Sequence, residues 1–315
     1  MRADAGGPAF GAAMIVGGMA VIGFTDNFVR VIAEDAGLWQ FHLFRSAMTL
    51  PLFGLAALGI GMALRPRRFG LVAVRSAVNA AAMLLYFGSL PMMPIAQVGA
   101  ALFTAPIWVL LFAAAFFRRR IGPRRMLAVG LGFAGVLVML RPDPANLSPV
   151  TLMPVAAGAL YGLSNLLTRE WCADEPVGAL LAGFFGAMGI AGALALGLIA
   201  LAPPPAAWVE AAPFLTAGWA PPTGRFLFWT FVQAAGSLVA VGLISKGYQS
   251  GETSFLAVFE YFFLVSVTFW AWLIWGDRLD APSAAGIALI VAAGLVIAGS
   301  RRPAQAAAAA GWKRP

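Results

Sequence analysis

Long apolar segments recur along almost the whole chain, and they limit its fold more than any other feature of the sequence. An α-helix needs about 20 residues to cross about 30 Å of hydrocarbon, and ten segments come close to that length. We therefore predict an all-α membrane protein with ten transmembrane helices. The predicted spans are residues 10–32, 38–62, 71–89, 95–116, 123–140, 150–169, 177–201, 226–246, 254–275 and 282–299.

The composition excludes several other classes of protein. Charged residues make up only 11% of the chain, against roughly 25% in soluble domains, so lipid must be part of its solvent. Cys172 is the only cysteine and His42 the only histidine, so the sequence predicts no disulfide and no metal site. The sequence also lacks a Gly-Lys-Ser/Thr phosphate loop, so we expect neither ATP nor another cofactor to be needed.

The basic residues fall in short clusters between the apolar segments. This pattern is typical of cytoplasmic loops and argues against a nucleic-acid-binding surface. If the N-terminus is cytoplasmic, the inner loops hold most of the 21 Lys and Arg residues. The positive-inside rule therefore predicts that both termini are cytoplasmic.

The two halves of the chain contain similar segments. Gly158-Ala-Leu-Tyr-Gly-Leu-Ser-Asn165 resembles Ala20-Val-Ile-Gly-Phe-Thr-Asp-Asn27, and the junction 116–121 corresponds to 274–279. Each half holds five spans, which is an odd number, so the second half must enter the membrane from the opposite side. Inverted repeats of this kind are typical of secondary transporters.

This repeat divides the chain into three parts. We predict a first five-helix repeat over residues 1–145, a second, inverted repeat over 146–300 and a disordered cytoplasmic tail over 301–315. The Pro- and Trp-rich segment 202–225 predicts a long loop in the membrane interface, where tryptophan is enriched.

Three motifs accompany the two repeats: Arg45 in Leu43-Phe-Arg-Ser, Tyr161-Gly-Leu-Ser-Asn165, and Trp275-Gly-Asp-Arg-Leu279. With them, about residues 10–300 resemble the EamA type of the drug/metabolite transporter superfamily. The resemblance implies a metabolite exporter of a bacterial inner (plasma) membrane, driven by proton exchange or by the substrate gradient. It does not name the substrate, because the family carries amino acids, cofactors, nucleoside-like compounds and drugs.

Two other functions stay open beside transport. An intramembrane enzyme that modifies lipids would need a denser His/Asp/Glu or Cys/His site than this sequence offers, so we do not expect an enzyme. A non-transporting membrane partner or receptor is the other alternative.

Ionisable residues inside spans are costly, and they are therefore candidates for function. Asp26 and Arg30 lie four residues apart in the first span, and His42 and Arg45 lie three apart in the next. We predict that neighbouring helices bring the four together, with Arg45 binding a carboxylate and Asp26 changing its protonation during transport. The substrate predicted from them is an amino acid or similar small zwitterion, with organic cations or drugs as the alternative. A structural ion pair is the non-functional interpretation.

Glu260 is the leading candidate for proton coupling, ahead of Asp26. It stands beside Tyr261 in an aromatic stretch, with no basic residue within one helical turn. Burial favours the protonated form of such an acid, so Glu260 could carry a proton or pair with an amine. The alternative is a permanently neutral, hydrogen-bonded acid.

Uncharged polar residues inside the spans could line a cavity, or they could only join helices. For substrate binding we select Asn79, Tyr161, Asn165, Gln233 and Tyr261, beside Arg45 and Asp26.

Overall fold

A computed structural model describes residues 8–117, 123–140, 149–172, 174–249 and 257–299. The predictions for the tail 301–315 and for residues 118–121 of the first junction lie outside the described residues. The first half forms α1 (Pro8–Asp26), α2 (Val29–Asp35), α3 (Leu38–Gly59), α4 (Phe69–Ser89), α5 (Ile95–Leu102), α6 (Ala105–Phe117) and α7 (Pro123–Leu140). The second half forms α8 (Pro149–Trp171), α9 (Val177–Leu201), α10 (Ala206–Ala211), α11 (Pro213–Thr216), α12 (Gly224–Gln249), the 3₁₀ helix η1 (Ala257–Tyr261), α14 (Phe262–Trp275) and α15 (Ala281–Gly299).

All regular structure in these ranges is helical, which confirms the all-α part of the predicted fold class. Each predicted span coincides with an apolar helical stretch. Six stretches are long and apolar enough to cross a membrane: Ala9–Asp35, Leu38–Gly59, Phe69–Ser89, Ile95–Phe116, Val177–Leu201 and Gly224–Ile244. The others are shorter: Met126–Val138, Leu152–Thr168, Phe259–Trp275 and Ala281–Ala293. Their membrane crossing, and with it the count of ten spans, stays a prediction.

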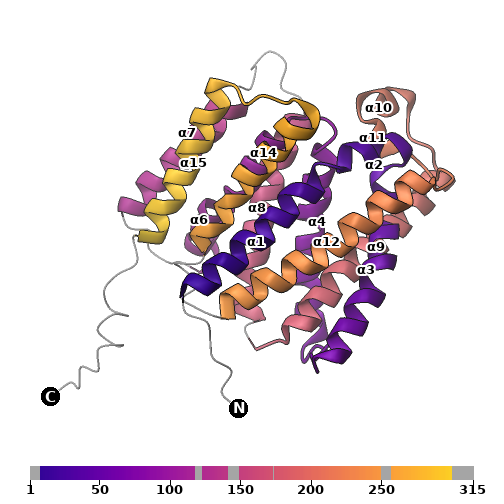
Figure 1. Cartoon of the computed structure of the whole chain (residues 1–315), viewed down its shortest axis with the longest axis horizontal. Helices are drawn as coiled ribbons and strands as arrows, with labels where there is room; N and C mark the ends of the chain where they lie inside the picture. The colour runs from indigo at the N-terminus through magenta and orange to yellow at the C-terminus, as the bar shows by residue number, and fades with distance from the viewer. Residues whose placement is uncertain (1–7, 118–122, 141–148, 173, 250–256, 300–315) are drawn as a thin grey trace.

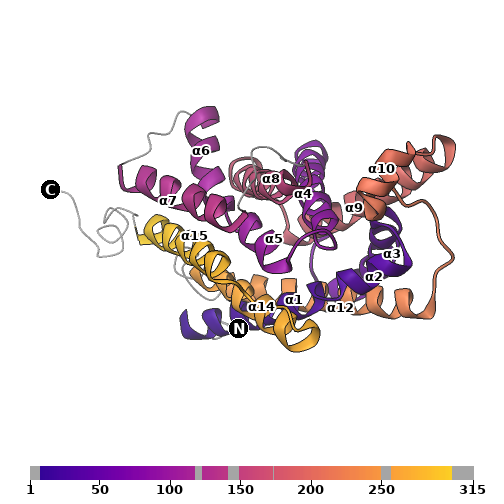
Figure 2. The same ribbon diagram turned by 90° about the horizontal axis from the view of Figure 1, so that it is seen from above.

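The helices form two layers, which Figure 2 shows from above. One layer contains α15, α14, α1 and α12, and the other contains α7, α6, α8 and α4. At one edge α7 packs on α15, and at the other edge α3 packs on α9. The first helix begins and the last helix ends at the same end of the bundle (Figure 1).

The main helix contacts come in pairs. Helix α1 packs on α12 and α14, while α8 packs on α4 and α6. Likewise α12 packs on α3, and α4 packs on α9. Each contact in one half has a counterpart in the other when the first five predicted spans are matched in order with the second five. The contact of α1 with α12 matches that of α8 with α4, for example.

Two of the predicted continuous spans are broken. The first ends as α1 at Asp26 and restarts as α2, because the Asn27 side-chain amide replaces helical hydrogen bonds. Its Nδ2 donates to the carbonyl oxygens of Gly23, at 2.7 Å, and Val267, at 3.1 Å. The break therefore needs a carbonyl from α14, which the sequence of the first span cannot reveal.

The fourth span breaks at Phe103 and Thr104, between α5 and α6. Pro106 lies just beyond the break and has no backbone N–H to donate back to Leu102. Helix α8 approaches this break closely. A Cβ atom at Gly158 would lie 2.5 Å from the Ala101 carbonyl oxygen, so only glycine fits there.

The interfacial segment 202–225 is anchored to the bundle. The Trp39 indole N–H donates to the Leu215 carbonyl oxygen at 2.6 Å, and the Gln40 side chain exchanges two hydrogen bonds with the backbone of Ala220. Trp208 and Trp219 stay exposed, as expected of interfacial tryptophans.

Candidate functional site

A buried polar cluster lies where α1, α3, α4 and α12 meet. Its centre is the Asp26 carboxylate at the end of α1. One oxygen accepts a hydrogen bond from the Tyr86 hydroxyl at 2.6 Å, and the other accepts one from Gln233 Nε2 at 2.7 Å. The three residues are at most 4% exposed. Because Tyr86 comes from the opposite layer, its bond to Asp26 joins the two layers.

Arg45 belongs to the same cluster, as its predicted proximity to Asp26 requires. Its Nη2 donates to the Ser237 hydroxyl at 2.6 Å, and this hydroxyl donates in turn to the Gln233 carbonyl oxygen at 2.7 Å. The guanidinium group also interacts electrostatically with Asp26. We call Asp26, Arg45, Tyr86, Gln233 and Ser237 the Asp26 cluster.

The Arg45 guanidinium is only partly hydrogen-bonded. Its Nε and Nη1 are buried and have no hydrogen-bond partner among the described residues, and the same holds for both ring nitrogens of His42. Its Cζ lies 4.8 Å from the ring centre of Phe87. An unsatisfied buried donor costs roughly 1–3 kcal/mol, and more when charged. A ligand with acceptor oxygens would remove this cost.

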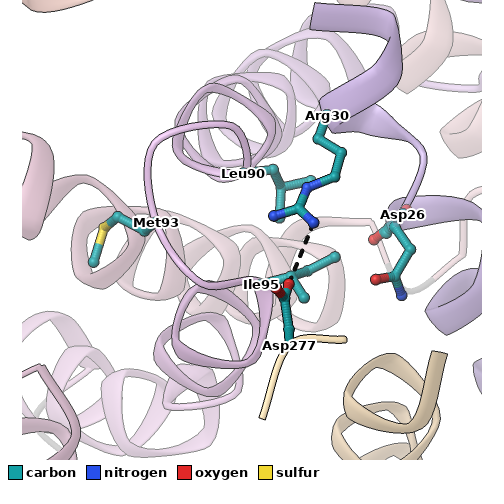
Figure 3. Close-up of a pocket in the computed structure, with 7 residues that line it drawn as sticks. Asp26, Arg30, Leu90, Met93, Ile95 and Asp277 are labelled. Atoms are coloured by element: carbon teal, nitrogen blue, oxygen red, sulfur yellow. Dashed lines mark ion pairs between the residues drawn. The ribbon is translucent and has the colours of Figure 1, made fainter. Parts of the chain in front are cut away.

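Arg30 does not join the cluster, contrary to the prediction. The helix break after Asp26 destroys the four-residue register between them, and Arg30 points to the α14–α15 connection. There its Nη1 lies 3.3 Å from an Asp277 carboxylate oxygen, and its guanidinium covers the Trp275 ring at 4.9 Å. Figure 3 shows this pair at the side of Asp26.

The space around the Arg30–Asp277 pair is small. A pocket between the two layers there is bordered by Asp26, Asn27, Arg30, Leu90, Met93, Ile95 and Asp277 (Figure 3). Its cavity volume is about 10 Å³, which is about the room that one ordered water needs. The bundle is therefore closed at this end of the Asp26 cluster.

A second polar cluster contains Glu260, Tyr161 and Asn165. The Tyr161 and Asn165 side chains share a hydrogen bond, and the Glu260 carboxyl group is close enough to interact electrostatically with the hydroxyls of Tyr161 and Tyr261. Arg75 also faces Tyr161. The sequence neighbours of Glu260 suggested an isolated acid, but Glu260 interacts electrostatically with Tyr161 of α8 and with Tyr261.

Further contacts define the edge of this second cluster. Arg75 Nε donates to the Thr168 hydroxyl at 2.7 Å. Asn165 is exposed, and Tyr161 and Glu260 are half-buried. We call Arg75, Tyr161, Asn165, Thr168 and Glu260 the Glu260 cluster.

Of the remaining predicted residues, Asn79 lies between the clusters along α4, and Tyr261 directly follows Glu260 and interacts with it electrostatically. Arg75, Asn79 and Tyr86 share one face of α4 through their spacing of four and seven residues. Asn79 is buried, and its Oδ1 has no hydrogen-bond partner in the described part of the chain. Tyr261 also lines an apolar groove beside α14.

Sequence reasoning includes Tyr86 among the residues that could line a polar cavity but does not select it for substrate binding, and it does not identify Ser237. Tyr86 was one of many uncharged polar residues within spans, although its seven-residue spacing from Asn79 places both on one helical face. Ser237 follows Gln233 by four residues on α12 and could have been found by the same rule.

Comparison with known proteins agrees with this architecture. Residues 9–141 match the EamA-like transporter family. A riboflavin transporter of Rhizobium johnstonii is 26% identical, over 84% of this chain and 80% of the relative. The pseudopaline exporter of Pseudomonas aeruginosa is 24% identical, over 89% and 94%. An S-adenosylmethionine uptake transporter of Rickettsia felis is 22% identical, over 70% and 71%.

A solved crystal structure has the same fold. It superposes with a TM-score of 0.62, covering 90% of this chain and 95% of that chain, at 17% sequence identity. Together with the apolar helices, these similarities establish an integral membrane protein with a general transporter role. Residues 9–141 hold an EamA domain, which makes the chain similar to the EamA-type transporters of the drug/metabolite transporter superfamily.

Proposed function

We propose that the protein is a secondary transporter that exports a small zwitterionic metabolite, such as an amino acid, by alternating access. The proposal includes ten spans in two inverted repeats, a bacterial inner membrane and two cytoplasmic termini. The paired contacts of the two halves support the repeat, because each main contact of α1 has a counterpart at α8. Inverted repeats allow one scaffold to open to either side of the membrane.

The observation that carries the substrate class is the buried, incompletely bonded guanidinium of Arg45. Arginine binds carboxylates through charge-assisted hydrogen bonds, and Nε and Nη1 of Arg45 are without partners among the described residues. Asp26, beside it, offers a negative charge to an amine. A zwitterion would satisfy both groups.

Asp26 is also our first candidate for proton coupling, and Glu260 is the second. Asp26 accepts hydrogen bonds from Tyr86, on the opposite layer, and from Gln233. Protonation would weaken its attraction to Arg45 and its bonds to these donors, so proton binding and separation of the layers would be linked.

Riboflavin is a second candidate substrate, because riboflavin transporters of two bacteria are each 26% identical to this chain. The aromatic rings around Arg45 suit a flat substrate as well. The guanidinium Cζ lies 4.8 Å from the ring centre of Phe87, 5.7 Å from that of Phe185 and 5.9 Å from that of Phe41.

The test is flux into proteoliposomes from a panel of amino acids, other zwitterions, organic cations and riboflavin, each with and without a pH gradient. We expect Arg45→Ala to lower the flux of the transported zwitterion about tenfold or more, since a charge-assisted hydrogen bond is worth roughly 1.5–3 kcal/mol. Arg45→Lys should restore only part of the flux, because lysine lacks the planar fork.

Arg65→Ala, which changes an exposed loop arginine, is the matched control and should keep normal flux. Normal flux of Arg45→Ala at normal expression would remove Arg45 from the site. Flux of riboflavin or organic cations alone would contradict the proposed zwitterionic substrate but would still support transport.

A further inference from the structure

An apolar groove of about 790 Å³ lies on the surface of the bundle between α14 and α15. The two helices are joined by the short connection 276–280, yet they pack on different partners. Helix α14 packs mainly on α1, and α15 packs mainly on α7. Because α14 and α15 pack on different helices, a groove remains between them. The presence of this groove does not depend on the proposed transport function.

The walls of the groove are apolar and aromatic. Val265, Phe269 and Trp272 of α14 are 61%, 49% and 52% exposed, and all three line the groove. Ile287 and Val291 of α15 form the opposite wall. Such a surface inside a bilayer is filled by hydrocarbon, because an apolar groove binds water poorly.

The length of the groove matches one lipid leaflet or more. Helix α14 has 14 residues, which correspond to about 21 Å at 1.5 Å per residue. One leaflet contributes about 15 Å, half of the roughly 30 Å hydrocarbon core. The groove beside α14 is therefore long enough to hold an acyl chain that spans one leaflet.

One end of the groove carries a cation at the level of the connection. Arg278 lines the groove there and is exposed. The neighbouring acids have other partners: Asp277, which also lines the groove, pairs with Arg30 at 3.3 Å, and Asp280 accepts a hydrogen bond from the Ser283 backbone N–H at 3.1 Å. Arginine binds phosphate oxygens in a bidentate manner.

We propose that this groove is a binding site for one anionic phospholipid. An acyl chain lies between α14 and α15, and Arg278 binds the phosphate group at the end of the groove. The inner end of the groove reaches Phe259 and Tyr261, which flank Glu260 in the chain. The bound chain therefore separates this part of η1 from bulk lipid.

The test uses photo-crosslinking in nanodiscs of phosphatidylcholine that contain a small fraction of phosphatidylglycerol with a diazirine in its acyl chain. Mass spectrometry of the digested full-length protein then locates the crosslinks. We expect them to concentrate in α14 and α15. Val265→Trp should fill the groove and lower this yield about tenfold, whereas Leu198→Trp, a matched change at a 66% exposed position on α9, should leave it unchanged.

Arg278→Ala tests the headgroup separately. It should lower the crosslinking of phosphatidylglycerol several-fold more than that of a phosphatidylcholine carrying the same diazirine. Crosslinks spread evenly over α9, α14 and α15, or an unchanged yield in Val265→Trp, would overturn the groove as a lipid site. Equal effects of Arg278→Ala on both lipids would overturn recognition of the anionic headgroup. Size-exclusion profiles and melting temperatures of all variants show whether they are folded.

Discussion

The Asp26 cluster and the Glu260 cluster contain similar residue types but differ in how deeply these residues are buried. In each, an acid interacts with a tyrosine of the α4–α8 layer, Asp26 through a hydrogen bond to Tyr86 and Glu260 electrostatically with Tyr161. Asp26 is buried and holds the Tyr86 hydroxyl at 2.6 Å, whereas Glu260 is half-buried and shares its surroundings with the exposed Asn165. The layers are therefore closed around Asp26 and more open around Glu260.

Helix α4 connects the two clusters. Arg75 belongs to the Glu260 cluster, Tyr86 belongs to the Asp26 cluster, and Asn79 lies between them on the same face. Eleven residues separate Arg75 from Tyr86, or about 16 Å along the helix. Under the proposed function, this face of α4 is the route between the clusters, and changes at its two ends should have different effects.

The largest effect is expected at the closed cluster. Asp26→Asn keeps the shape of the side chain but removes the charge beside Arg45. Asp26 accepts two buried hydrogen bonds, and a hydrogen bond to a charged group is worth roughly 1.5–3 kcal/mol. We therefore expect a lower melting temperature and a loss of pH-driven flux of tenfold or more. Flux in proteoliposomes and thermal unfolding measure the two effects.

Asp174→Asn, which removes an exposed loop acid, is the control for this substitution. Normal stability together with normal pH-driven flux in Asp26→Asn would show that the charge of Asp26 is needed neither for the cluster nor for coupling. The buried Asp26 cluster would then have no role in coupling that distinguishes it from the Glu260 cluster.

The sequence predicted much of this arrangement, and its failures have one cause. The apolar segments located the helices, and the rarity of buried charge selected Asp26, Arg45 and Glu260. Contacts between distant segments could not be read in the same way. The partner of Arg30 is Asp277, and the neighbour of Glu260 is Tyr161, each far away in the chain.

The helix break after Asp26 shows the same limit. Residues 10–32 are largely apolar despite Asp26, Asn27 and Arg30, so sequence alone predicts one helix. The Asn27 amide ends it by binding the Val267 carbonyl oxygen on α14. Only the packing of α1 on α14 brings that acceptor into reach.

A smaller and more selective effect is expected at the open cluster. Glu260→Gln mimics the protonated acid and keeps its shape, so the protein should fold normally. We expect it to lose pH-driven transport but retain part of its substrate exchange. Uptake driven by a pH gradient and exchange at equal pH, measured in the same liposomes, separate the two activities.

Glu210→Gln on the exposed helix α10 serves as the control. If Glu260→Gln keeps its full pH-driven flux, Glu260 is a structural acid and Asp26 becomes the single candidate for coupling. The open cluster would then bind substrate without taking part in proton movement.

The smallest effect concerns the loops at the open end. Glu175, in the α8–α9 connection, accepts hydrogen bonds from the backbone N–H groups of Arg67, at 2.7 Å, and Arg68, at 2.9 Å. The Arg68 side chain lies 3.4 Å from the same carboxylate. These bonds join the α3–α4 and α8–α9 connections just beyond Arg75 and Thr168. They hold the end of the bundle together while the Glu260 cluster stays accessible.

Glu175→Gln should therefore loosen the open end without changing the closed one. Burial acts to raise the pKa of Glu175, but the two backbone N–H groups and the Arg68 side chain outweigh it, so its pKa lies below the ordinary value of 4.5. A carboxyl group with a lowered pKa stabilises the folded state above pH 4.5, and this stabilisation is lost as the pH falls through the lowered pKa. We expect the variant to melt a few degrees below the wild type at neutral pH and the difference to shrink under acid conditions. A difference that persists unchanged in acid would assign the role of Glu175 to its shape and not to its charge.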